Sequence, residues 1–97
     1  MNILLHNNDC IGRVVYSKAG RDKGRVLMIL SVLNDKYVNV CDGNLRTIEK
    51  PKKKKVKHLT FTMTVAEDVR DMLLSGEKIN NVMISKFLQS YDNSKEV

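Results

Sequence analysis

The sequence predicts a mainly β fold with an α-helical appendage, in which a small barrel or strongly bent sheet is followed by a helical hairpin. Three observations lead to this prediction. Short runs rich in β-branched residues alternate with turn signals as far as Glu49. Apolar residues at helical spacing begin near Thr64. The length of 97 residues suits one small domain, which we expect as a barrel with a basic extension over 1–59 and a helical appendage over 60–97.

The first strands follow from the apolar runs. Arg13–Ser17 predicts a short strand, and Arg25–Leu33 predicts a longer one. The middle of the longer run is apolar on both faces, so we expect that strand to be central and covered. Asn34–Asp35 supplies a turn, and Lys36–Cys41 then alternates as a half-buried strand does.

A further hairpin is predicted after these strands. Asp42–Gly43 is a strong two-residue hairpin signal, and Leu45–Glu49 alternates again. Several short strands joined by tight turns favour a closed or strongly bent sheet. Closure would protect so small a sheet from pairing with other chains through its edges.

Helical patterning starts after the basic middle of the chain. Thr64 and Glu67 fit a capping box, in which the threonine caps the helix and the glutamate reaches back. The first helix is expected to run through about Ser75 and to stop at Gly76.

A second helix is predicted over Asn81–Tyr91, capped by Asn80 or Asn81, with a frayed end over Asp92–Val97. A short amphipathic helix must bury its apolar stripe against something. We expect these helices to cover one barrel opening, with docking onto a protein partner as the alternative.

The charge is concentrated in the first half of the chain. The net charge is +6 and the pI is about 9.5. Residues 12–58 hold thirteen Lys/Arg and four Asp/Glu, a net of +9, whereas residues 59–97 carry a net of −2. This asymmetry indicates a basic face directed at an anionic partner.

The loop Ser17–Gly24 contains the types of residue that commonly contact a phosphate backbone. Gly20 and Gly24 let the backbone adopt positive φ and approach another surface closely. The cations of this loop and its following strand are Lys18, Arg21, Lys23 and Arg25. We expect Asp22 to orient a neighbouring arginine or to close a turn. The alternative is an ordinary solvated hairpin with surface lysines.

A second basic segment surrounds Pro51. Its cations, together with one on the preceding predicted strand, are Arg46, Lys50, Lys52, Lys53, Lys54, Lys55 and Lys57. Adjacent lysines repel, so we expect this run to be extended and hydrated until an anion arrives, and to widen the same basic face. A solubilising charge run without a partner is the alternative.

The stretch Gly12–Ile29 resembles a KOW motif, with alternating apolar and polar residues, a basic tip and Gly24 at the characteristic glycine. Together with the Asp-Gly-Asn-Leu-Arg segment at 42–46 and the Lys-Pro-Lys-Lys-Lys-Lys segment at 50–55, it is similar to small bacterial RNA-binding proteins of the KOW class. Those are related to KOW-type large-subunit ribosomal proteins of the archaeal and eukaryotic class. The similarity covers residues 12–59 strongly and the helical tail loosely.

The resemblance implies an SH3-like barrel that docks on structured RNA, and ribosomal RNA in particular. A constitutive ribosomal component and a transient factor remain alternatives. KOW domains also occur in transcription elongation factors of the NusG type, so a protein-interaction module of the transcription or translation machinery is the rival hypothesis. Such a module would bind through its barrel or its helical tail. In the tail, the apolar or acidic surface, with Glu67, Asp68 and Asp71, would carry the contact.

No sequence feature favours catalysis, a cofactor, a small-molecule substrate or a metal. His6 and His58 have no partner at metal-ligand spacing, and no Walker loop, dinucleotide fingerprint or nucleophile elbow occurs. Met1–Leu5 is too short for a signal h-region or a membrane span, so we expect a cytoplasmic protein in which Cys10 and Cys41 are reduced.

The aromatic residues allow two interpretations. Tyr16 and Tyr37 could stack on unpaired bases. We favour core or rim packing for both, because apolar burial is scarce in a small domain. For the same reason we assign Phe61, Phe87 and Tyr91 to helix packing.

Overall fold

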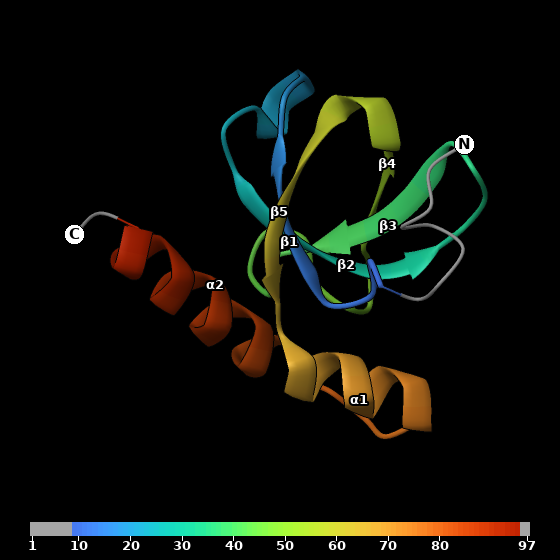
Figure 1. Ribbon diagram of the computed structural model, residues 1–97, viewed down its shortest axis with the longest axis vertical. Coiled ribbons are helices and arrows are strands. Elements are labelled where there is room, and N and C mark those ends of the chain that lie inside the picture. Colours follow the sequence, from blue (N-terminus) through green and yellow to red (C-terminus); the bar gives the residue numbers. More distant parts are fainter. Residues whose placement is uncertain (1–8, 96–97) are drawn as a thin grey trace.

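The computed structural model describes residues 9–95 of the chain (Figure 1). His6 and Met1–Leu5 lie outside the described residues. In chain order the elements are β1 (Arg13–Ser17), the 3-10 turn η2 (Gly20–Asp22), β2 (Val26–Val32), β3 (Tyr37–Cys41), β4 (Lys52–Lys55), the 3-10 turn η3 (Val56–His58), β5 (Leu59–Val65), α1 (Glu67–Ser75) and α2 (Asn81–Lys95). The predicted combination of a β-rich half and two following helices is therefore confirmed.

The strands form one antiparallel sheet in the order β4-β3-β2-β1-β5. β2 lies at its centre, as its apolar middle predicted. Only the three residues of η3 separate the two edge strands, β4 and β5, along the chain. The sheet must therefore curl strongly to bring its edges within reach of each other, and register shifts in the β1–β5 and β2–β3 pairs help it to bend.

The expected closed barrel is wrong, because β4 and β5 do not pair and the sheet stays open between them. β4 has four residues, and a side-chain contact from it spans part of the gap where a ladder would have run. On the other side of the gap, the backbone N–H of Lys18, in the β1–β2 loop, donates to the His58 carbonyl in η3 at 2.7 Å and continues the β1–β5 pairing beyond Ser17 and Leu59. The Lys54 ammonium of β4 donates to the Ala19 carbonyl of the same loop at 2.9 Å.

Apolar side chains on both faces of the sheet are buried. The concave side encloses Cys10, Val15, Leu27, Ile29, Val38, Val40 and Leu59. The opposite side packs Val14, Met28 and Cys41 against Ala66, Val69, Ile84 and Leu88. Adjacent residues such as Val14 and Val15 thus serve different clusters, as the alternation of side chains along a strand requires. Neither cysteine forms a disulfide, and both are buried.

The two helices cover the outer face of the sheet, opposite the concave core (Figure 1). The tail is therefore an intramolecular cover, but the expectation that it covers a barrel opening is wrong. The reason is that Val14, Met28 and Cys41 form a second apolar face that needs burial. Phe87 and Tyr91 pack there as expected, whereas Phe61 packs against the concave cluster, because it belongs to β5 and not to a helix.

The helix ends match the sequence only in part. Gly76 ends α1 in the left-handed region, at φ 81°, as predicted. The capping box is wrong, because Thr64 lies in β5 and Ala66 precedes α1 without a side-chain cap. The Asn80 side chain accepts from the Met83 N–H at 2.9 Å and caps α2. This helix continues to Lys95, so it extends through part of the segment predicted to fray.

The predicted strand Leu45–Glu49 is also wrong. Asp42–Gly43 opens a longer connection, in which the Asp42 side chain accepts from the backbone N–H groups of Asn44 and Arg46. The Asn81 side chain of α2 accepts from the Ile48 N–H at 2.9 Å, which holds this connection against the helix instead of in the sheet. The fourth strand is the lysine run itself.

Candidate nucleic-acid interface

The β1–β2 loop is a compact turn with its cations outside. The Gly24 N–H donates to the Ser17 carbonyl at 2.8 Å and closes the loop at its base. Gly24 has φ 85°, and an added Cβ would meet nothing within 4 Å, so its glycine serves the backbone conformation of the turn. Lys18, Arg21 and Lys23 are exposed on this loop.

Asp22 of this loop is only 4% exposed, and its carboxylate is surrounded by cations. Its carboxylate lies 3.5 Å from the Arg46 guanidinium, 4.0 Å from the Arg25 guanidinium and 4.0 Å from the Lys54 ammonium. Asp22 therefore lies beside the neighbouring Arg25, in keeping with one of the two roles expected for it. The structure adds two cations from distant segments to the same carboxylate, because a buried charge needs nearby opposite charges to offset its lost hydration.

Lys54 differs from the other lysines of β4. It is 8% exposed, and its ammonium contacts Asp22 and the Ala19 carbonyl. Its position opposite Val38 in the β3–β4 pair points it toward the concave side of the sheet. Its charge therefore holds the β1–β2 loop on β4 and does not lie at the surface.

The neighbouring lysines stay accessible. Lys53 and Lys55 are exposed on the other face of β4, Lys57 is exposed in η3, and Lys50 is exposed just before the strand. Lys52 is half-buried. The run is extended as predicted, but it is paired with β3 and was not expected to be a strand.

The fold brings the two predicted basic segments together. The Lys18–His58 and Lys54–Ala19 contacts join the β1–β2 loop to β4 and η3. In Figure 1 this loop and η3 lie at one end of the molecule and the helices at the other. We call the surface formed by the loop cations Lys18, Arg21 and Lys23 and by Lys52, Lys53, Lys55 and Lys57 the basic end. The acidic residues Glu67, Asp68 and Asp71 are exposed on α1, away from this end.

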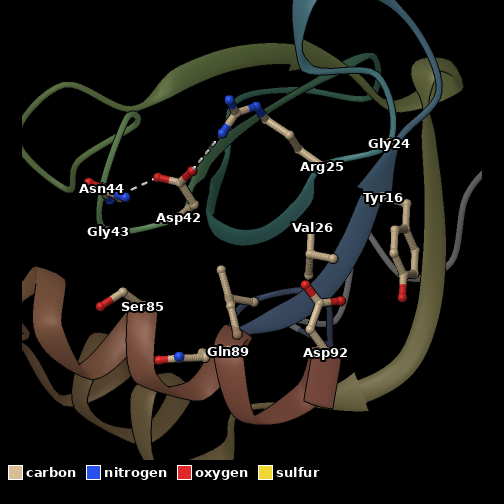
Figure 2. Close-up of a pocket in the computed structure, with 11 residues that line it drawn as sticks. Tyr16, Gly24, Arg25, Val26, Asp42, Gly43, Asn44, Ser85, Gln89 and Asp92 are labelled. Carbon is tan, nitrogen blue, oxygen red and sulfur yellow. Dashed lines mark hydrogen bonds and ion pairs between the residues drawn. The ribbon is translucent and has the colours of Figure 1, made fainter. Parts of the chain in front are cut away.

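Two predicted site cations are partly engaged within the protein. Arg46 lies beside Asp22, and its side chain is 32% exposed. Arg25 approaches Asp22 and also Asp42, 3.7 Å from its guanidinium. Figure 2 shows Arg25 pointing toward Asp42 beside a hollow that the β1–β2 hairpin, the 42–44 turn and α2 line. The volume of this hollow is about 770 Å³. Since Asp92 of α2 also lines this hollow, its charges are mixed and do not favour an anion.

Sequence reasoning did not single out Lys36 as part of the basic surface. It precedes β3, and its carbonyl accepts from the Val56 N–H of η3 at 2.8 Å. This contact places it beside Lys55 and Lys57, with which it lines one hollow. The sequence gives no local sign of this neighbourhood, because Lys36 lies at least nineteen positions from Lys55 and Lys57 in the chain. Only the β3–β4 register brings them together.

Three further features bear on the kind of site in residues 9–95: a metal cluster, a membrane-spanning helix and a reactive thiol. No group of three or more His, Cys, Asp or Glu there is placed to hold a metal ion. No helix in that part of the chain is long and apolar enough to cross a membrane. Burial raises the pKa of the Cys41 thiol to about 12 and also raises the pKa of the Cys10 thiol, so neither is an activated nucleophile.

Comparison with known proteins finds similarity to a protein of Bacillus subtilis. No protein-family model matches the chain. The chain is 28% identical over 71 residues to a Bacillus subtilis (strain 168) protein named "Putative ribosome-binding protein YbzG". The match covers 73% of this chain and 96% of that protein, so nearly the whole relative corresponds to part of this chain.

Proposed function

We propose that this protein binds structured RNA without catalysing a reaction, and that it associates with the ribosome through its basic end. The sheet order β4-β3-β2-β1-β5, with a 3-10 turn between β4 and β5, supports an SH3-like domain of the KOW type in which the barrel is left open. The name of the Bacillus relative supports the ribosome as the partner.

One observation carries the proposal. Within the lysine run, the side chain of Lys54 is buried, and its ammonium contacts both Asp22 and the Ala19 carbonyl. This contact fixes the glycine-containing loop beside β4. The exposed cations of both segments therefore belong to one end of the molecule, although about thirty residues of sequence separate them.

The mechanism is electrostatic docking. Each lysine or arginine that neutralises a phosphate releases condensed counterions, which supplies affinity without reading sequence. The exposed side chains Lys18, Arg21 and Lys23 form one set of phosphate contacts, and Lys53, Lys55 and Lys57 form the other. Two separated sets of contacts recognise the spacing of phosphates, so a folded RNA is favoured over an arbitrary strand.

The test is a charge reversal with a matched control. Arg21→Glu combined with Lys23→Glu should weaken co-sedimentation with bacterial ribosomes, and binding to protein-free ribosomal RNA, by more than about tenfold. Both side chains are exposed, so the unfolding midpoint should change little. Lys78→Glu combined with Lys86→Glu makes the same change in net charge on the helical side of the molecule and should leave binding within about twofold. Equal effects of the two pairs would contradict a directed interface.

A protein-interaction module remains the rival function, and the exposed surface of the helices is the observation that favours it. Leu74 of α1 is 53% exposed and Val82 of α2 is 57% exposed, and the acidic residues of α1 are exposed as well. Under this alternative, Glu67→Lys combined with Asp71→Lys abolishes ribosome association, while binding to protein-free RNA is unaffected. Under our proposal that variant keeps both ribosome association and binding to protein-free RNA.

A further inference from the structure

A hollow of about 470 Å³ is lined by residues at and just before the start of β3, at the end of β4 and in η3. These elements can be located in Figure 1. It is lined by Asp35, Lys36, Tyr37, Lys55, Val56 and Lys57. Its walls are fixed by backbone contacts, because the Val56 N–H donates to the Lys36 carbonyl at 2.8 Å. The Asn34 side chain also accepts from the N–H groups of Lys36 and Tyr37, at 2.8 and 3.0 Å. The hollow is therefore formed in the free protein and has the size of a small-ligand site.

Tyr37 gives the hollow an aromatic wall. The ring is half-buried, and the Lys53 ammonium sits over it, 4.4 Å from the ring centre. Tyr37 pairs with Lys55 across the β3–β4 ladder, so the lysine stem continues the apolar surface beside the ring. Val56, also half-buried, completes this surface.

The rim of the hollow is cationic. Lys36, Lys55 and Lys57 are exposed around it, and Asp35 is its one acidic lining residue. A planar apolar wall beside several cations fits a ligand that is both aromatic and anionic. The hollow beside Arg25 does not fit one, because Asp42 and Asp92 offset its single arginine.

We propose that this hollow holds an unpaired nucleotide of RNA, with the base against the side of the Tyr37 ring that faces the hollow and is not covered by Lys53, and with the flanking phosphates on Lys36, Lys55 and Lys57. The proposal rests on the function proposed above and refines it. Lys55 belongs to β4 and Lys57 to η3. Both elements contact the β1–β2 loop, so the hollow adjoins the basic end. A structured RNA with a looped-out base would then bind the basic end through its phosphates and this hollow through its base.

The experiment separates base stacking from charge attraction. A short single-stranded RNA carries one 2-aminopurine and a fluorescein end label, so that anisotropy reports binding and 2-aminopurine emission reports stacking. Wild-type protein should quench the 2-aminopurine on binding. Tyr37→Leu should remove the quenching and weaken binding about tenfold, whereas Tyr37→Phe keeps the ring and should retain both.

The matched control is Tyr16→Leu. Tyr16 is the other half-buried tyrosine of the sheet, but its ring lies 6.3 Å from the ring of Tyr91 in α2. The Tyr16→Leu variant should leave 2-aminopurine quenching and RNA affinity within about twofold of the wild type. Urea unfolding of each variant establishes that the protein is folded under the assay conditions.

The outcomes distinguish this inference from the proposed function. Binding that shows no quenching, or quenching that survives Tyr37→Leu, overturns the nucleotide site while RNA binding stands. Equal quenching of free 2-aminopurine riboside monophosphate at the same concentration shows a small-molecule site and overturns recognition through RNA. No rise in anisotropy with any RNA, at low salt, contradicts the proposed function and this inference together.

Discussion

Replacing Asp22 by asparagine removes the carboxylate that three cations share, and its cost can be worked from the structure. Asp22 is 4% exposed and Lys54 is 8% exposed, with 4.0 Å between carboxylate and ammonium. Two unit charges at that distance attract by about 4 kcal/mol at an effective dielectric constant of 20. Without the carboxylate, the Lys54 ammonium keeps its desolvation cost and loses this attraction. We expect Asp22→Asn to lower the free energy of unfolding by about 3–5 kcal/mol.

Removing the lysine and keeping the carboxylate should lower the free energy of unfolding by less. In Lys54→Met, Asp22 still has the guanidinium groups of Arg46 at 3.5 Å and Arg25 at 4.0 Å. The variant loses the charged hydrogen bond to the Ala19 carbonyl but keeps an unbranched apolar stem in place. We expect a loss of about 1–2 kcal/mol.

Urea unfolding followed by circular dichroism measures both effects. For a slope of about 1–3 kcal/mol per molar urea, Asp22→Asn should lower the midpoint by about 2 M. Lys23→Gln changes an exposed charge in the same loop and should stay within about 0.5 kcal/mol of the wild type. A loss below about 1 kcal/mol for Asp22→Asn would refute the reasoning that this carboxylate holds the loop on β4. A loss for Lys54→Met that exceeds the loss for Asp22→Asn would refute it as well.

Three further changes test other parts of the account by urea unfolding. Gly43→Ala should lower the free energy of unfolding by more than about 2 kcal/mol, because φ is 79° and a Cβ would overlap the Asn81 carbonyl oxygen, while Gly24→Ala, with open space around it, should cost about 1 kcal/mol. Similar losses for both would contradict the close packing of the 42–46 connection on α2. Asn80→Ala should cost about 1 kcal/mol through loss of the α2 cap, and an unchanged midpoint would contradict that cap. Cys41 has its pKa raised from 9.0 to about 12, so the unfolded chain releases a proton that the folded protein keeps, and the free energy of unfolding should fall as the pH rises from 9 toward 12, by at most about 1.4 kcal/mol per unit. Cys41→Ala should fall less steeply, and equal slopes would contradict burial of the thiol.

The sequence predicted the elements whose signals are local. The apolar middle of β2, the Asn34 turn and the Gly76 helix end each depend on residues within a few positions of one another, and all three are confirmed. The short strands β1 and β3 were predicted for the same reason.

The errors arise where a distant contact decides the structure. Leu45–Glu49 alternates like a strand, but the Asn81 side chain of α2 takes the Ile48 N–H. The lysine run has low strand propensity, yet it pairs with β3 through Tyr37–Lys55 and three further residue pairs. Tertiary pairing overrides local preference in both cases.

The candidate site shows the same division. Composition and glycine placement indicated which segments carry the positive charge, but only the fold shows which charges are accessible. Lys54 is identical in sequence context to its neighbours, and its burial against Asp22 depends on the face of β4 from which it projects. The hollow at Tyr37 depends on the same register, because Lys36 and Lys57 meet there only after β3 and β4 pair.

The most direct measurement of the central claim is the dependence of RNA affinity on KCl concentration for the wild type, Lys23→Gln and Lys54→Met. If about six phosphates of a single-stranded RNA are neutralised, the logarithm of the association constant should fall with the logarithm of salt with a slope of about −4. Lys23→Gln should reduce the size of that slope by about 0.7, and Lys54→Met should leave it unchanged because this ammonium is buried against Asp22. A wild-type slope near zero, or a slope that Lys54→Met reduces as much as Lys23→Gln does, would contradict a basic end whose exposed cations, and not the buried Lys54, neutralise the phosphates.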